Sequence, residues 1–239
     1  ITREEGLVRI AKAQALMKGN RIGAVLVESG PSLDYFTGVK WWRSERLTGA
    51  VIPAIGEPII VTPFFERPSV EESLRIPAEV RVWQEHEEPL KLVADFLKER
   101  GVADRPIGSE ETNRYFILDR LQQQLPGTSI VSANPVVRAQ RMIKTPAELA
   151  LMQAASDITI AAYRRIHPQI REGMTPEDIE KLFNAAITSL GGSSPWALIL
   201  LGEAAAYPHG SGKPQHVRRA DVVLLDCGCS VHGYQSDIS

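Results

Sequence analysis

The chain has little cysteine, almost no net charge and no long apolar run, and each of these absences removes a class of protein. Two cysteines in 239 residues cannot form a disulfide framework, and the spacing of Cys227 and Cys229 within one strand does not suit a bridge between them. We expect both to be small buried residues in a reducing compartment. A net charge of −2 supplies no basic field for nucleic acid or an acidic membrane. No apolar run approaches the roughly 20 residues of a membrane-spanning helix.

Several catalytic fingerprints are also missing. The sequence has no glycine-rich dinucleotide or P-loop motif and no G-x-S-x-G elbow, so a nucleotide-binding protein or a serine hydrolase lacks support. The chain opens on Ile1 rather than methionine and stops at Ser239, inside an expected strand. We therefore expect a piece of a longer, cytoplasmic protein, although this opening is also compatible with a removed signal peptide.

The first 135 residues alternate between amphipathic helices and short apolar strands. Apolar residues at helical spacing predict helices over 2–19, 88–100 and 112–124, and apolar runs predict strands at 22–27, 47–55, 58–62, 80–83, 105–108 and 129–131. Gly56-Glu57 joins two of these strands as a hairpin candidate. This alternation predicts a compact α/β domain over 1–135.

The pattern changes after Asn134-Pro135, where long helices begin. Thr145, followed by Pro146 and Glu148, predicts an N-capped helix that runs to about residue 166. The segment 175–178 repeats this start signal for a second helix, and a strand-rich segment follows from residue 195. We therefore expect an α+β domain over 136–239.

The last fourteen residues carry two aspartates eleven positions apart, Asp226 and Asp237. A buried strand run precedes Asp226, and glycines flank an expected turn. A two-residue turn at Val231-His232 would place the aspartates directly opposite each other, with β-carbons about 4.5–5.5 Å apart, where like charges repel. A divalent cation offsets this repulsion, and two cations about 3.5–4 Å apart do so better. The alternatives are two solvent-facing aspartates at a hairpin edge, or a bulge that shifts the register.

The ligand chemistry of this pair favours hard divalent ions. Carboxylates without a His/Cys cluster suit Mn²⁺, Mg²⁺ or Zn²⁺. Cys227 and Cys229 alternate with Asp226 along the strand, so we expect both thiols on the opposite face. His209 lies in a Gly/Pro-rich loop seventeen residues before Asp226 and is a candidate to bind a substrate carbonyl or move a proton. The alternative for His209 is a surface loop histidine.

A third cluster lies near the N-terminus. Trp41, Trp42, Arg43 and Arg46 follow the segment 34–38, and aromatic and arginine residues in a loop can form a recognition surface. The alternative is a mixture of core and ordinary surface residues.

These motifs together resemble a known family. The D-C-G of 226–228 and the G-Y-Q-S-D-I of 233–238 are similar to the D-x-G…G-Y-x-x-D-[IT] hairpin of the pita-bread metallopeptidases, which include Xaa-Pro aminopeptidase, prolidase and methionine aminopeptidase. Pro208-His209 matches the family's loop histidine, and 141–149 resembles the R-x-x-K-[ST]-x-x-E-[IL] opening of its catalytic domain. The segment 34–38 resembles the N-terminal domain shared by Xaa-Pro peptidases and creatinase. The resemblance implies a creatinase-like α/β N-terminal domain followed by an incomplete α+β pita-bread domain.

The resemblance also implies roles for individual residues. Asp226 corresponds to the aspartate that chelates one of two divalent metal ions, Asp237 to the one that bridges both, and His209 to the residue that contacts substrate at the scissile peptide. Mn²⁺ is the first expectation, with Zn²⁺ or Co²⁺ as alternatives. The implied activity is hydrolysis of the bond before proline at the N-terminus of a peptide. The N-terminal domain implies a homodimer in which Trp41 or Trp42 closes a neighbour's site.

The family's other three ligands, one His and two Glu, lie downstream of the second aspartate, and the sequence ends two residues after Asp237. We therefore expect this piece alone to be metal-free or weakly occupied, and inactive. Two alternatives remain within the same fold. One is a pita-bread protein that has lost its ligands and serves as a binding module, and the other is a creatinase-like amidinohydrolase that uses no metal. Retention of Asp226 and Asp237 argues against both.

Overall fold

The computed structural model describes residues 2–239, which form two compact units with the boundary between Ile143 and Lys144. The boundary expected at 135/136 falls before helix α6 (Val137–Met142), and Val137 packs in the core of the first unit. Among the described residues, no helix combines the length and the apolar character needed to cross a membrane.

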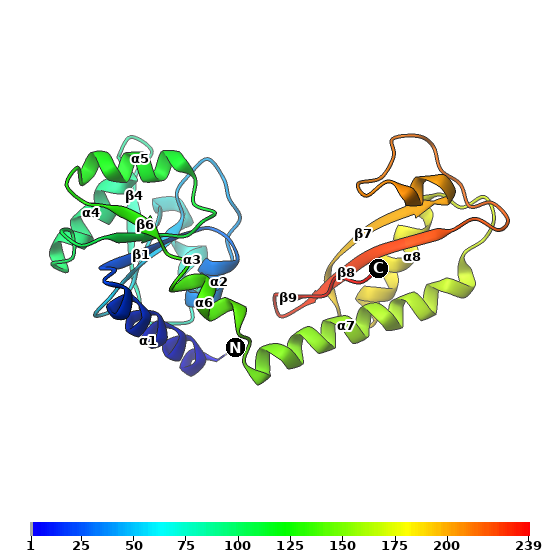
Figure 1. Ribbon diagram of the computed structural model, residues 1–239, viewed down its shortest axis with the longest axis horizontal. Helices are drawn as coiled ribbons and strands as arrows, with labels where there is room; N and C mark the ends of the chain where they lie inside the picture. Colours follow the sequence, from blue (N-terminus) through cyan, green and yellow to red (C-terminus); the bar gives the residue numbers. More distant parts are fainter. Residues whose placement is uncertain (1) are drawn as a thin grey trace. The chain divides into compact units, whose positions relative to one another are not determined.

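A six-stranded mixed sheet forms the centre of the first unit (Figure 1). Its strands are β1 (Ala24–Glu28), β2 (Gly49–Pro53), β3 (Ile59–Pro63), β4 (Glu79–Trp83), β5 (Ile107–Ser109) and β6 (Ile130–Ser132). They lie in the order β4-β3-β2-β1-β5-β6. Only β2 runs antiparallel to its neighbours, which confirms the hairpin expected between β2 and β3.

Helices cover both faces of this sheet, because residues that alternate along β1 enter two separate cores. Val25 and Val27 pack with α1 (Arg3–Asn20), α2 (Pro31–Thr37), α3 (Arg67–Ser73) and α6. Ala24 and Leu26 pack on the other face with α4 (Pro89–Glu99) and α5 (Tyr115–Gln124). A short 3₁₀ turn, η1 (Phe64–Glu66), precedes α3. The three predicted helices and six predicted strands are confirmed, and α2, α3 and α6 are additional.

The second unit packs two helices against one face of a three-stranded antiparallel sheet. Its elements are α7 (Pro146–Ile166), η2 (His167–Gln169), α8 (Pro176–Ser189), β7 (Ser193–Leu201), η3 (Gly202–Ala206), β8 (Val223–Val231) and β9 (Tyr234–Gln235). Both predicted helix starts are confirmed as complete capping boxes, Thr145 with Glu148 and Thr175 with Asp178. The sheet order is β7-β8-β9.

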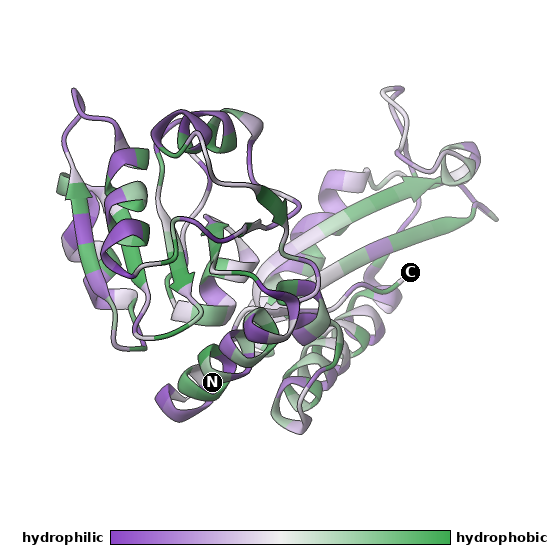
Figure 2. Cartoon of the chain, turned by 60° about the vertical axis from the view of Figure 1, so that its left-hand side comes forward, coloured by the Kyte–Doolittle hydropathy of each residue, from purple (hydrophilic) through white to green (hydrophobic). Residues whose placement is uncertain are grey.

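One face of the second sheet is apolar and lies against the helices. Ile199, Leu201, Cys227 and Cys229 form a core with residues of α7 and α8, and Figure 2 shows hydrophobic residues along both long strands. We call the other side, which carries Trp196, Leu198 and Asp226, the outer face. The predicted orientation of both cysteines is confirmed, since each is fully buried on the helix side. Both thiols are free.

Candidate metal centre

The hairpin that carries the two aspartates has a different register from the one expected. Its turn is His232-Gly233, because Val231 pairs with Tyr234 and Ser230 with Gln235. Both turn residues have positive φ, 49° and 89°, as a type I′ turn requires. The expected turn at Val231-His232 would have put a β-branched residue in the left-handed region, where it is strained.

The new register separates the aspartates along the strands. Cys227 pairs with Ile238, so Asp226 lies opposite Ser239 and not opposite Asp237. The Ser239 hydroxyl donates to the Asp226 carboxylate at 3.0 Å. The prediction of direct opposition is therefore wrong, and the change in register comes from the position of the turn and not from the bulge considered as an alternative. Diagonal neighbours in such a ladder lie about 7–8 Å apart.

Both carboxylates nevertheless share the outer face. Opposed residues in an antiparallel pair point to the same side, and so do residues two apart on a strand. Asp226 opposes Ser239, which is two residues from Asp237, so all three side chains lie on one side. Asp226 is half-buried and Asp237 is exposed. None of the ion pairs formed by residues 2–239 includes either carboxylate, so nothing in this part of the chain neutralises the pair.

Gly228 lies two residues after Asp226 and opposite Asp237, and its missing side chain leaves room for Ser236 and Trp196. A β-carbon there would come within 2.0 Å of the Ser236 carbonyl oxygen and 2.4 Å of the Trp196 indole nitrogen. Trp196 pairs with Gly228 across β7 and β8. The D-x-G pattern therefore has a steric cause, since the residue opposite Asp237 must have no side chain.

The loop that carries His209 lies over the same face. Leu198 pairs with Asp226, and Leu200 with Leu224, so both leucines point outward. The α-carbon of Gly210 lies close to both, since a β-carbon there would be 3.3 Å from Leu200 and 3.6 Å from Leu198. His209 precedes this contact and is exposed. The structure therefore brings the His209 loop and Asp226 to one side of the sheet.

The donor set fits part of a divalent metal site. Carboxylate oxygens are hard ligands that suit Mn²⁺, Mg²⁺ or Zn²⁺. In the part of the chain that the structure describes, no group of three or more His, Cys, Asp or Glu side chains converges on a point where a metal ion could bind. Asp226 and Asp237 would therefore supply two ligands, and further ligands must complete the coordination shell.

Sequence reasoning missed two residues of α7 that contact the hairpin from the core side. Thr159 and Tyr163 lie one helical turn apart, and their hydroxyls bond to residues next to the aspartates. Burial raises the pKa of Tyr163, and its hydrogen bond with Cys227 acts in the same direction. Burial also raises the pKa of the Cys227 thiol, to about 11. The sequence did contain a signal for these two residues, because Thr159 and Tyr163 place hydroxyls at i and i+4 on the apolar face of a predicted helix.

The tryptophan and arginine cluster belongs to the first unit. Trp41 packs against its core, whereas Trp42 is 92% exposed. Arg46 pairs with Glu45 and Glu85, and Arg43 donates to the Thr112 carbonyl at 2.5 Å. Trp42 is thus the member of this cluster that is open to a partner.

Comparison with known proteins is consistent with this layout of an α/β unit and a second unit with paired carboxylates. The model of the creatinase/prolidase N-terminal domain matches residues 9–143, and that of metallopeptidase family M24 matches 150–239. The first of these models covers more than half of the chain, so the chain belongs to the family with a creatinase/prolidase N-terminal domain, and its second part matches family M24, as the sequence resemblance implied.

Several relatives match nearly the whole chain. An uncharacterized peptidase of Schizosaccharomyces pombe is 30% identical over 99% of this chain and 54% of its own length. A probable dipeptidase PepE of Mycobacterium tuberculosis is 29% identical over 96% of this chain and 61% of its own. The chain therefore spans roughly half to two thirds of the length of these relatives.

Solved structures show the same fold. Dipeptidase PepE from Mycobacterium ulcerans superposes with a TM-score of 0.86 at 27% identity, over 99% of this chain and 64% of that one. Prolidase from Thermococcus sibiricus superposes with a TM-score of 0.85 at 25% identity, over 96% of this chain and 63% of that one. The expected creatinase-like domain followed by a pita-bread domain is thus confirmed.

Proposed function

We propose that the full-length protein is a metal-dependent peptidase that hydrolyses the bond before proline at the N-terminus of a peptide. The observation that carries this proposal is the pair of unneutralised carboxylates on one face of the hairpin, within an M24 domain. The relatives support the substrate class, since Xaa-Pro dipeptidases of Pyrococcus horikoshii and Pyrococcus furiosus match nearly all of this chain.

Three residues of this chain have roles in the proposed site. Asp226 and Asp237 would hold the divalent metal ions of this site. When bound, the ions lower the pKa of water and polarise a carbonyl group. His209 contacts the substrate at the scissile peptide, which its exposed position over the outer face allows. Carboxylate ligands select by availability and geometry as much as by affinity, and we propose Mn²⁺ as the physiological ion.

Two properties of the whole protein belong to the same proposal. We infer a homodimer in which the N-terminal unit closes the partner's site, with exposed Trp42 as the first candidate for the contact and Trp41 as the second. Wild-type activity in the double variant Trp41→Ala/Trp42→Ala would count against this role. The two free buried thiols support a cytoplasmic location, since reducing compartments keep cysteines unpaired.

A substrate panel tests the proposed activity. Purified full-length protein is incubated with Ala-Pro, Ala-Pro-Ala, Ala-Ala and creatine, with and without a chelator, and then with Mn²⁺ restored. We expect cleavage of the proline peptides alone, loss with the chelator, and recovery with Mn²⁺. The relative rates of hydrolysis of Ala-Pro and Ala-Pro-Ala distinguish a dipeptidase from an aminopeptidase. Chelator-resistant hydrolysis of creatine would favour the amidinohydrolase, and metal-free binding without turnover would favour a binding module.

Variants of the acid pair test the site itself. Asp237→Asn should abolish metal-dependent turnover, because an amide is a weaker ligand and carries no charge. Asp221→Asn is a matched control, since Asp221 lies on the loop before β8 and accepts from the Arg218 backbone at 2.9 Å. Retained activity in Asp237→Asn would exclude Asp237 as a metal ligand.

A further inference from the structure

The segment that carries Asp237 pairs with β8 through a short and irregular ladder. Strand β9 has two residues, and beyond it a single bridge joins Cys227 to Ile238. At Ser236 one backbone bond of the ladder remains, since the Ser236 amide donates to the Cys229 carbonyl at 2.9 Å, whereas the Cys229 amide donates to the Ser236 hydroxyl at 3.0 Å. Backbone bonds therefore hold both neighbours of Asp237, and side-chain contacts add to them.

Helix α7 supplies those contacts from the buried side of the sheet. The Thr159 hydroxyl lies 2.8 Å from the Ser236 hydroxyl, and both side chains are buried. One turn further along, the Tyr163 hydroxyl lies 2.6 Å from the Ile238 carbonyl oxygen. Ser236 and Ile238 are the two neighbours of Asp237 in the chain, so the helix bonds to a side chain on one side of this carboxylate and to the backbone on the other.

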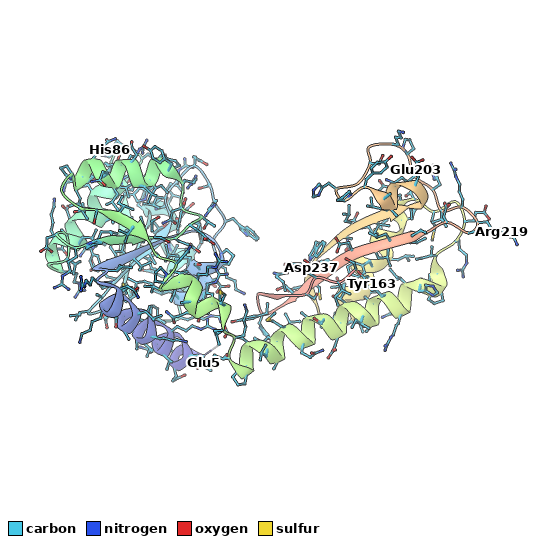
Figure 3. All side chains as sticks on the ribbon, in the orientation of Figure 1. Glu5, His86, Tyr163, Glu203, Arg219 and Asp237 are labelled. Carbon is cyan, nitrogen blue, oxygen red and sulfur yellow. The ribbon has the colours of Figure 1, made fainter. Side chains whose placement is uncertain are left out.

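Tyr163 also reaches the strand that carries the other aspartate. Its hydroxyl lies 3.2 Å from the carbonyl oxygen of Leu225, which precedes Asp226. The Tyr163 hydroxyl therefore lies between two carbonyl oxygens on adjacent segments, and its single proton can be donated to either of them. Figure 3 places Tyr163 and Asp237 in the same region of the second unit. One side chain thus ties the backbones next to both carboxylates.

We propose that Thr159 and Tyr163 are positioning residues that set the separation of Asp226 and Asp237 for metal binding, a role that rests on the proposed function. The pair is diagonal across the ladder, so a small slide of one strand past the other changes the distance between the carboxylates. Removal of a group that orients a metal ligand without touching the metal commonly weakens metal affinity about 10–100-fold. The Tyr163 hydroxyl acts on the backbone next to both aspartates and the Thr159 hydroxyl on the Ser236 side chain, and neither hydroxyl contacts metal or substrate.

Metal titration of the full-length, metal-depleted protein tests this role. We expect Tyr163→Phe and Thr159→Val each to weaken Mn²⁺ affinity at least about tenfold and to alter the visible spectrum of bound Co²⁺. Thr159→Ser, which keeps the hydroxyl, should restore both. Ile179→Val is the matched control, because Ile179 is buried in the same core. It should lower thermal stability without changing metal affinity or the Co²⁺ spectrum.

Hydrogen exchange provides a readout that needs no metal. The Cys227 and Ile238 amides donate to each other's carbonyls at 3.1 Å, and in metal-free protein both should exchange faster in Tyr163→Phe than in Ile179→Val. Wild-type affinity and spectrum in Tyr163→Phe, or an equal loss in Ile179→Val, would overturn the positioning role. Wild-type protein that binds no metal would instead refute the proposed function, and the exchange rates would still show whether Tyr163 orders the hairpin.

Discussion

At the scale of single residues, the segment 226–229 places alternate side chains on the outer face and in the core. Asp226 points to the outer face, while Cys227 and Cys229 point into the core. Gly228 faces outward but has no side chain, and the Ser236 carbonyl and the Trp196 indole occupy that space. The cysteines are therefore restricted by packing and Gly228 by the space available, while the proposed metal site is the reason for an acid at Asp226.

Substitution of Gly228 should be costly. In Gly228→Ala the new β-carbon would meet backbone and an indole ring, neither of which can yield cheaply, so we expect a loss of about 1–3 kcal/mol in the free energy of unfolding. Urea denaturation measures it. Gly212→Ala is the control, since nothing lies within 4 Å of its β-carbon position. Equal stability of the two variants would show that the strands tolerate the extra atom.

The buried Cys227 thiol should make stability depend on alkaline pH. Burial raises its pKa from 9.0 to about 11, against a partial opposing effect of the hydrogen bond with Tyr163. The unfolded chain loses this proton first, so the contribution is complete below pH 9.0 and is lost as the pH rises to about 11. Cys227→Ala should flatten the fall in unfolding free energy over this interval, measured by urea denaturation. Ile187→Val, a neutral change in the same core, should leave the fall intact.

At the scale of elements, helix α7 links local sequence signals to the site. Thr145 and Glu148 form a complete capping box at its start, and the same helix presents Thr159 and Tyr163 to the hairpin. The cap determines where the helix begins. The position of the helix on the sheet then determines which hydroxyls reach which strands.

Removal of the cap should weaken the whole second unit. Thr145→Ala leaves the Glu148 amide without its side-chain acceptor, and loss of an N-cap costs about 0.5–2 kcal/mol. We expect a corresponding fall in thermal stability, followed by circular dichroism. Thr188→Ala is a suitable comparison, because Thr188 bonds only within the last turns of α8. If the cap contributed nothing to stability, Thr145→Ala and Thr188→Ala would have the same thermal stability.

At the scale of the whole molecule, the chain has two units with separate cores and spans about half to two thirds of its relatives. The first unit contains the exposed Trp42, and the second contains the acid pair. Of the proposed dinuclear site, residues 2–239 would supply two carboxylates, and no third ligand converges with them in this part of the chain.

Metal affinity should therefore depend on the length of chain that is expressed. We expect the 239-residue polypeptide alone to bind Mn²⁺ more weakly than the full-length protein and to show no hydrolysis of Ala-Pro. Isothermal titration of both forms, with Asp226→Asn as the ligand-deficient reference, measures the difference. Stoichiometric metal together with proline-dependent hydrolysis by the 239-residue form would contradict this expectation.

Much of the secondary structure followed from local rules. Capping residues, apolar periodicity and the hairpin at Gly56-Glu57 predicted the long helices and all six strands of the first unit. The short helices α2, α3 and α6 were not predicted, because six or seven residues carry too little periodic signal. The place of each aspartate on the outer face was also local information, since alternation along a strand determines it.

The sequence by itself determined which residues face outward, because the period of a strand is a property of its backbone. The structure showed the register of the hairpin, which moved the aspartates from opposite to diagonal positions. The positive φ of His232 and Gly233 is a local cause of this register, whereas the close approach of Ser236 to Gly228 is a tertiary one. The hydrogen bonds from Thr159 and Tyr163 to the hairpin also depend on the tertiary structure, since they join residues more than seventy positions apart.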